Sequence, residues 1–283
     1  MTETLSKLGH KHKCDKYTEH LYTQIYENYF HPLKNYDIKL LEIGIYRGAS
    51  LKMWNDYFCN GHIYGIDILE NYFGEGKPIS TEEYSNRIKT LGGVDAGNRK
   101  DLERMIDTFN FKLESLDIII DDGSHCLHDH QVSLGFLFKY LKPGGIYVIE
   151  DLISQNVNHN TSQTLTGNGV IQRGTFYKFN KRRAKDLNKW VDADSYLFPH
   201  EHNTVDMIKK MISSKQKLNE YNVQSEYMTI KEKDYLKNNL ETIEAYQKNN
   251  LINSDLDIWG EKINEDEINP FRWPDICFFK KRK

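Results

Sequence analysis

The chain has 283 residues, of which 39% are hydrophobic and 28% charged, so it can bury the core of one large domain. A formal net charge of −3 argues against a nucleic-acid partner, because phosphate binding needs clustered Lys and Arg. No stretch approaches the roughly 18 apolar residues of a membrane span, and the first residues lack the apolar core of a signal peptide, so we expect a cytoplasmic protein.

The first part of the chain predicts a helix followed by a strand–helix–strand unit. Residues 14–30 carry apolar and aromatic side chains at helical spacing, and His31-Pro32 would end that helix. Residues 38–43 are predicted to form the first strand and residues 49–59 the helix after it. A second short strand is predicted at 62–67, ending in an acid.

The middle of the chain continues this alternation. Strands are predicted at 116–121 and 146–150, and helices at 81–89, 98–109 and 128–140. Alternating strands and helices favour a mostly parallel, doubly wound α/β sheet.

The pattern weakens after Asp151. Residues 152–178 are rich in Asn, Thr, Gln and Gly and are too long for a simple connection, which indicates a lid. Four more elements are predicted, namely helices at 181–190 and 205–214 and strands at 225–230 and 275–279. The polar region 231–268 is predicted to be partly helical, and its position in the fold is not predicted.

A turn containing glycine follows the first predicted strand, in the order Glu42-x-Gly44-x-x-x-Gly48. Such glycines let the backbone approach a ligand closely, and the start of the next helix offers free N–H groups. The spacing differs from the Gly-x-Gly-x-x-Gly turn of dinucleotide-binding proteins. Asp67 lies 23 residues after Gly44, where an acid accepts hydrogen bonds from ribose hydroxyls, although it could instead cap a helix or close a turn.

Two further acids are candidates for the cofactor side of the site. Asp95 could lie by an adenine or cap the helix that follows it. Asp121 and Asp122 are adjacent, so their side chains should point to opposite sides of the strand. One of them can then face a cofactor while the other faces a metal.

Two apolar runs end abruptly in acids, DIIIDDGSH at 117–125 and GGIYVIED at 144–151. Carboxyl ends of neighbouring parallel strands form the active sites of open α/β sheets, so Asp122, Glu150 and Asp151 should converge. With no basic partner these carboxylates would repel one another, and a cation such as Mg²⁺, which prefers oxygen ligands, is expected among them. The alternative is a set of acids that cap helices and bind water.

His125, three residues past Asp122, is the candidate general base, because a neutral imidazole takes up a proton near pH 7. Its alternative is a structural histidine. Zinc is disfavoured, because His125, His128 and His130 cannot easily converge and the four cysteines lack Cys-x-x-Cys spacing.

Residues 36–152 resemble the class I S-adenosylmethionine-dependent methyltransferases through LLEIG, YGIDI, IIDDGSH and KPGGIYVIED. More narrowly they resemble the metal-dependent sugar O-methyltransferases that act on macrolide deoxysugars and the related cephalosporin-hydroxylase-like group. The resemblance implies a Rossmann-like, seven-stranded sheet with an N-terminal helix and a lid or insertion after the fifth strand.

The resemblance also implies roles for particular residues. Asp122, Glu150 and Asp151 would bind Mg²⁺ or another hard divalent cation, and His125 would be the general base. The residues assigned to S-adenosylmethionine are Glu42, Gly44, Tyr46, Ser50, Asp67, Asp95 and Asp121, with Asp67 on the ribose and Asp95 near the adenosine.

The implied organisation has three parts. Residues 1–35 form an N-terminal helical segment, 36–152 the core that binds cofactor and metal, and 153–283 the lid, acceptor-binding region and last strands. The implied reaction is in-line methyl transfer to a hydroxyl of a sugar or glycan. The alternatives are an NAD-dependent sugar oxidoreductase and a non-catalytic protein on the same scaffold, and a homo-oligomer is compatible with each.

Overall fold

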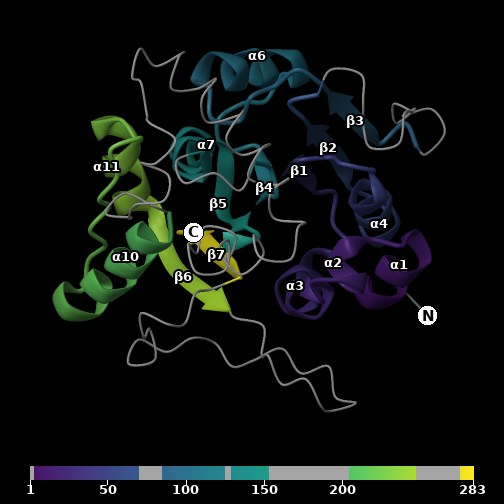
Figure 1. Cartoon of the computed structure of the whole chain (residues 1–283), viewed down its shortest axis with the longest axis horizontal. Helices are drawn as coiled ribbons and strands as arrows, with labels where there is room; N and C mark the ends of the chain where they lie inside the picture. Colours follow the sequence, from purple (N-terminus) through teal and green to yellow (C-terminus); the bar gives the residue numbers. More distant parts are fainter. Residues whose placement is uncertain (1–2, 70–84, 125–128, 153–203, 247–274) are drawn as a thin grey trace, which may run out of the picture.

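A computed structural model describes residues 3–69, 85–124, 129–152, 204–246 and 275–283 (Figure 1). Its centre is one seven-stranded sheet in the order β3-β2-β1-β4-β5-β7-β6. The strands are β1 (Lys39–Ile43), β2 (His62–Ile66), β3 (Ile88–Leu91), β4 (Leu116–Asp121), β5 (Leu141–Ile149), β6 (Leu240–Tyr246) and β7 (Ile276–Lys281). The first five are parallel, and β7 runs antiparallel to both of its neighbours. The predicted doubly wound, mostly parallel, seven-stranded sheet is confirmed.

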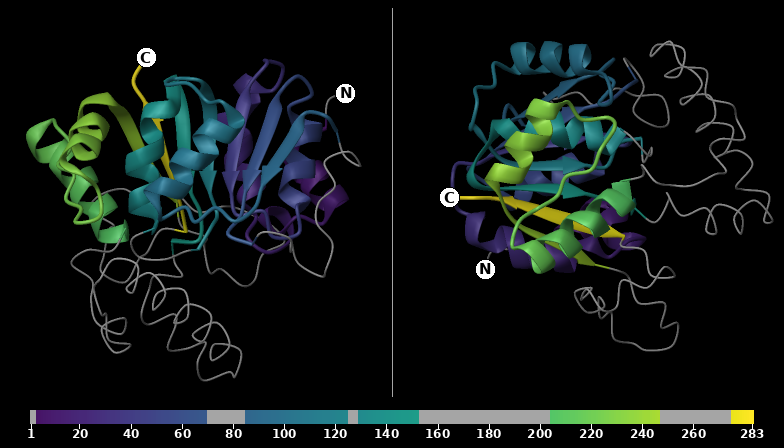
Figure 2. Two further views of the ribbon diagram at one scale, coloured as in Figure 1. Left: turned by 90° about the horizontal axis from the view of Figure 1, so that it is seen from above. Right: turned by 90° about the vertical axis from the view of Figure 1, so that its left-hand side faces the viewer.

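Helices cover both faces of the sheet (Figure 2). One face packs against α6 (Arg99–Phe109), α7 (Asp129–Leu137), α10 (Thr204–Leu218) and α11 (Ile230–Asn239). The other packs against α1 (Leu5–His12), α3 (Tyr22–Phe30) and α4 (Ala49–Tyr57). Because both faces are covered, the central strands are apolar almost throughout, as in the LDIIID sequence of β4.

The N-terminal segment differs from the continuous helix predicted at 14–30. A short helix, α2 (Asp15–Thr18), is separated from α3 by Leu21, whose left-handed φ of 58° cannot continue a helix. The helix α1, which the sequence pattern did not predict, precedes both and is capped by the Thr4 hydroxyl. Together α1, α2 and α3 lie along one edge of the site described below (Figure 1).

Two predicted elements are wrong. Residues 88–89, predicted as the end of a helix, begin β3, because Ile88 pairs with Ile63 of β2. Residues 225–230, predicted as a strand, form a turn in which the Ser225 hydroxyl accepts the N–H groups of Tyr227 and Met228. Thr229 then caps α11 in a capping box with Glu232.

The remaining predictions agree with the structure wherever it describes them. The strands at 38–43, 62–67, 116–121, 146–150 and 275–279 and the helices at 49–59, 98–109, 128–140 and 205–214 all exist, with shifted ends. The helix predicted at 181–190 and the lid at 152–178 lie outside the described residues, apart from Leu152. No helix in the described part is long and apolar enough to span a membrane.

Candidate active site

Three neighbouring strands end level with one another at one edge of the sheet. Ile43, the last residue of β1, pairs with Asp121 of β4, which in turn pairs with Ile149 of β5. The residues that follow, Gly44, Asp122 and Glu150, therefore share this edge. This is the place where open α/β sheets bind ligands.

The turn after β1 needs its glycine for the backbone itself. Gly44 has a φ of +91°, and a Cβ atom there would lie 2.1 Å from the carbonyl oxygen of Asp122. Gly48 is the N-cap of α4 and has no side chain to cap the first N–H groups of that helix. Those groups are left to water or to a ligand.

Asp67 closes the same turn. Its Oδ2 accepts hydrogen bonds from the N–H groups of Ile45 at 2.9 Å and Tyr46 at 3.3 Å, and its Oδ1 accepts one from Leu69 at 3.0 Å. Asp67 therefore does close a turn, which was one of the alternatives to a role in binding ribose. The carboxylate is half-buried, and the donors that it binds are backbone groups, so both oxygens keep acceptor capacity for a further ligand.

Two other predicted cofactor residues lie in turns outside the helices and strands. Tyr46 is 60% exposed. Asp95 accepts the N–H of Gly97 at 3.0 Å, whereas the cap of α6 is the Asn98 side chain, so the capping role proposed for Asp95 is wrong.

The side chains of Asp121 and Asp122 point to opposite sides, as predicted. Asp121 is buried beneath α7, where it accepts hydrogen bonds from the hydroxyls of Ser133 and Tyr147. Asp122 points instead to the N-terminal segment, where it meets the ammonium of Lys16.

Glu42, in β1, is fully buried and accepts a hydrogen bond from the Ser50 hydroxyl at 2.8 Å. Burial raises the pKa of its carboxyl to about 7, although the nearby Lys16 ammonium lowers it. Ser50 thus contacts Glu42. The ion pair between Glu42 and Lys16 connects these two residues to the acids that follow β4 and β5.

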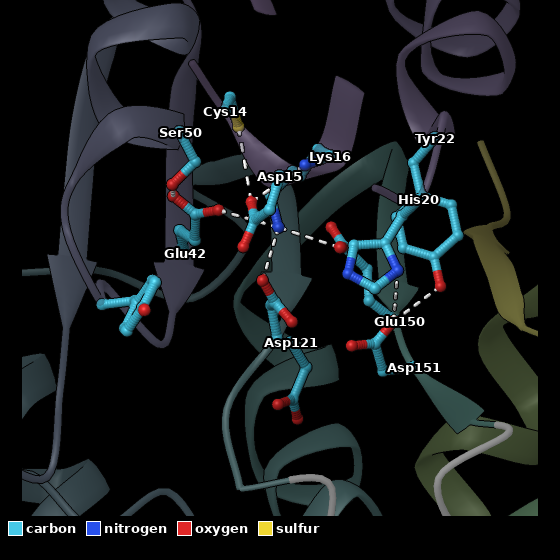
Figure 3. Close-up of polar contacts among 12 residues, drawn as sticks. Cys14, Asp15, Lys16, His20, Tyr22, Glu42, Ser50, Asp121, Glu150 and Asp151 are labelled. Atoms are coloured by element: carbon cyan, nitrogen blue, oxygen red, sulfur yellow. Dashed lines mark hydrogen bonds and ion pairs between the residues drawn. The ribbon is translucent and has the colours of Figure 1, made fainter. Parts of the chain in front are cut away.

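Lys16 of α2 lies in the centre of these acids (Figure 3). Its Nζ is 2.6 Å from Oδ2 of Asp122, 2.8 Å from Oε2 of Glu150 and 3.4 Å from Oε1 of Glu42. Its side chain is only 1% exposed. Burial alone lowers the pKa of the Lys16 ammonium, but the three carboxylates outweigh burial and raise that pKa well above its ordinary value.

The expectation that the acids have no basic partner is therefore wrong. The ammonium of Lys16 supplies one positive charge among the carboxylates of Glu42, Asp122 and Glu150, which reduces their mutual repulsion. The second oxygen of Glu150, Oε1, accepts a hydrogen bond from the hydroxyl of Tyr26 in α3. Both oxygens of Glu150 are thus held by the N-terminal segment.

Asp151 belongs to the same edge but has different partners. It has a left-handed φ of 53°, and its Oδ1 accepts a hydrogen bond from the Tyr22 hydroxyl at 2.7 Å. His20 lies 3.5 Å from the same oxygen and stacks on the Tyr22 ring (Figure 3). Asp151 is 20% exposed, so one side of its carboxylate faces solvent.

In this conformation the acids are divided between two groups of partners. Within the described ranges, no set of three or more His, Cys, Asp or Glu is arranged as a ready-made metal site. His125, the predicted general base, lies outside the described residues.

Four site residues, Lys16, His20, Tyr22 and Tyr26, come from the N-terminal segment. The helical pattern of 14–30 indicated mainly core packing, with Tyr17 or Tyr22 as side chains that could reach a ligand, and it predicted no role in the site for Lys16, His20 or Tyr26. One feature of the sequence could have predicted the role of Lys16. Three converging acids need a nearby positive charge, and Lys16 lies between the aromatic residues of 14–30.

Comparisons of sequence identify relatives that are named as O-methyltransferases. The mycinamicin VI 2''-O-methyltransferase of Micromonospora griseorubida is 33% identical over 156 residues, covering 52% of this chain and 36% of that protein. The demethylmacrocin O-methyltransferase of Streptomyces fradiae is 37% identical over 142 residues, covering 47% and 32%. The chain thus spans about a third of the length of the relatives it matches. No protein-family model matches the chain.

Comparison of structures identifies neighbours with the same fold. The structure of the MycE methyltransferase from the mycinamycin biosynthetic pathway in complex with Mg and SAH aligns with a TM-score of 0.59 at 21% identity, covering 100% of this chain and 56% of that one. A second crystal form gives 0.61. The fold is therefore that of a class I methyltransferase, as the resemblance implied.

Proposed function

We propose that the protein is an S-adenosylmethionine-dependent, Mg²⁺-dependent O-methyltransferase that acts on a hydroxyl of a sugar or glycan. One observation carries the proposal. The acids after β4 and β5 lie beside the glycine-containing turn after β1, at the edge where this fold binds its ligands. The similarity to enzymes named as O-methyltransferases supports the same conclusion.

The turn after β1 fits the cofactor. The uncapped start of α4 follows this turn directly in the chain. Asp67, just after β2, bonds the turn and has spare acceptor capacity for ribose hydroxyls. The fully buried pair of Glu42 and Ser50 supports this turn from inside. We assign Gly44, Tyr46, Asp95 and Asp121 to the cofactor side as the resemblance implies.

The acids fit a divalent cation by charge. Glu42, Asp122 and Glu150 bring three carboxylates against one ammonium, and Asp151 adds a fourth carboxylate nearby. An excess of buried or half-buried oxygen ligands is the chemistry that Mg²⁺ prefers. We therefore propose Asp122, Glu150 and Asp151 as its ligands, with Asp151 turning from Tyr22 to join the other two.

When bound, S-adenosylmethionine would supply the methyl group and Mg²⁺ would stabilise the developing alkoxide of the acceptor. The methyl group would go to the acceptor oxygen, and S-adenosylhomocysteine would be the leaving group. His125 takes the proton of the hydroxyl. Glu42, buried and bonded to Ser50, keeps the turn after β1 fixed while this happens.

The choice of acceptor is proposed to depend on residues outside the cofactor- and metal-binding core. We propose that residues 36–152 hold cofactor and metal and that residues 153–283 supply the acceptor-binding region together with the last strands. The segment 1–35 joins the site as well, because Lys16 and Tyr26 contact its acids.

Calorimetric titration of the protein with S-adenosylhomocysteine in the presence of Mg²⁺ tests the proposal. We expect micromolar binding, and no heat with NADH under the same conditions. Binding of NADH without binding of S-adenosylhomocysteine would replace the methyltransferase by an oxidoreductase. Binding of neither would leave a non-catalytic protein on this scaffold.

A further inference from the structure

Lys16 cross-links the ends of three strands that are far apart in the sequence. Its ammonium joins Glu42 of β1, Asp122 after β4 and Glu150 after β5, and the last two lie 106 and 134 residues away from it along the chain. Two of its N–H donors bond the carboxylates of Asp122 and Glu150, and the contact with Glu42, at 3.4 Å, is an ion pair. The contact therefore fixes the relative positions of these three strand ends.

The lysine lies on the buried side of the acids. The side chains of Lys16, Glu42 and Glu150 are 1%, 0% and 1% exposed, whereas those of Asp122 and Asp151 are 21% and 20% exposed. A cation that enters from solvent meets Asp122 and Asp151 first and finds Lys16 behind them. The ammonium and a divalent cation can therefore bind Asp122 from different sides, and each carboxylate oxygen of Glu150, which accepts one hydrogen bond, keeps a second lone pair.

The charges are compatible with both cations. Glu42, Asp122, Glu150 and Asp151 carry up to four negative charges, and Lys16 balances one of them. Tyr26 holds the second oxygen of Glu150, so the orientation of this carboxylate is fixed by two donors from the N-terminal segment. Partners of this kind orient the ligands of a metal, and their loss typically costs roughly 10–100-fold in metal affinity.

We infer that Lys16, with Tyr26, is a positioning residue that holds Asp122 and Glu150 in the geometry needed to bind the divalent cation. This inference rests on the proposed function, because it assigns Lys16 a role at the proposed metal ligands. It makes the N-terminal segment a necessary part of the metal site. The competing description is that Lys16 replaces the metal and excludes it.

Calorimetric titration with MgCl₂ alone tests the inference without any turnover. We expect the dissociation constant of the Lys16→Met variant to rise roughly 10–100-fold relative to the unchanged protein. Lys16→Arg, which keeps the charge, should recover part of that loss. Tyr26→Phe removes one hydroxyl, leaves the buried lysine in place and should weaken Mg²⁺ binding several-fold.

Lys281→Met is the matched control. Lys281 is also buried, and its ammonium binds the Glu114 carboxylate, the Leu141 carbonyl and the Tyr235 hydroxyl, none of which belongs to the site. It should lose thermal stability and keep its Mg²⁺ affinity. The rise in Tm that saturating Mg²⁺ produces gives a second readout for each variant that folds.

The outcomes separate the inference from the proposed function. Absence of Mg²⁺ binding in the unchanged protein overturns the metal part of the proposed function and this inference with it. Binding by the unchanged protein with equal affinity in Lys16→Met and Tyr26→Phe overturns the inference alone. Tighter binding by Lys16→Met overturns it in favour of competition between lysine and metal.

Discussion

Gly44 and Asp122 lie so close that no side chain fits between them. A Cβ atom on residue 44 would lie 2.1 Å from the carbonyl oxygen of Asp122, and the Asp122 N–H donates to the carbonyl of Ile43 at 2.9 Å. The end of β4 is thus locked against the turn after β1. These backbone contacts join the proposed cofactor turn to one proposed metal ligand.

Gly44→Ala should therefore be strongly destabilising. The variant combines a left-handed φ of +91° with a collision against backbone that cannot move aside, and we expect a loss of roughly 3 kcal/mol or more in the free energy of unfolding. Gly144→Ala is the control, because Gly144 has a φ of +79° but its nearest neighbour atom, in Lys283, is 3.6 Å away. That control should lose about 1–2 kcal/mol from backbone strain alone. Urea unfolding measures both, and equal losses would show that the contact with Asp122 is unimportant.

The sheet and its edge followed from the sequence because they depend on local patterns. The apolar run before Asp121 and Asp122 predicts a buried strand, and alternating side chains predict that these two acids diverge, as they do. Parallel strands bring their carboxyl ends together, so the meeting of Asp122 and Glu150 could also be expected.

The contacts of the N-terminal segment did not follow from the sequence. Helical periodicity shows that residues 14–30 bury one face, but it does not show which part of the sheet that face meets. The break at Leu21 depends on a left-handed backbone that the pattern does not reveal. The site of Lys16 is therefore a tertiary result, set by packing across more than a hundred residues.

Glu232 should give the protein a pH-dependent increment of stability on the face of the sheet that α6, α7, α10 and α11 cover. Its carboxylate receives two hydrogen bonds from Arg99, at 2.8 and 2.6 Å. Burial alone raises the pKa of Glu232, but the bonds from Arg99 and from the Thr229 backbone lower it below the ordinary 4.5 overall. A lowered pKa means that the increment is fully present above pH 4.5 and disappears as the pH falls through the lowered pKa.

Glu232→Gln should accordingly cost about 1 kcal/mol at neutral pH and much less in acid, since the pair is partly exposed to solvent. Thermal unfolding across this pH range measures the difference. Glu220→Gln, which removes an exposed partner of Lys237, should show no such pH dependence. A constant effect of Glu232→Gln at all pH values would mean that hydrogen bonding by the neutral side chain, and not the charge, supplies the stability.

His125→Ala should separate chemistry from binding. If His125 is the general base, its loss lowers kcat roughly 10²–10⁴-fold. The affinities for S-adenosylhomocysteine and Mg²⁺, measured by calorimetry, should stay unchanged. His31→Ala, at an exposed histidine after α3, is the control and should retain full turnover. Near-normal turnover of His125→Ala would remove it from the mechanism.

Asp122→Asn should abolish the response to the divalent cation and leave the fold intact. The substitution keeps the shape of the side chain but removes the charge of a proposed ligand, so the dissociation constant for Mg²⁺ should rise by roughly 10-fold or more. Turnover that remains should be insensitive to EDTA, whereas turnover of the unchanged protein should be lost with EDTA and restored by added Mg²⁺.

Asp117→Asn makes the same change on the same strand and is the matched control for Asp122→Asn. Asp117 is also paired with a lysine, Lys142, at 2.8 Å, and it accepts the N–H of Lys39, but it lies at the opposite end of β4. A general effect of removing a paired acid from β4 would appear in both variants as lower stability. An effect on Mg²⁺ affinity in Asp122→Asn alone would locate the metal at the end of β4, and equal Mg²⁺ affinity in both would exclude Asp122 as a ligand.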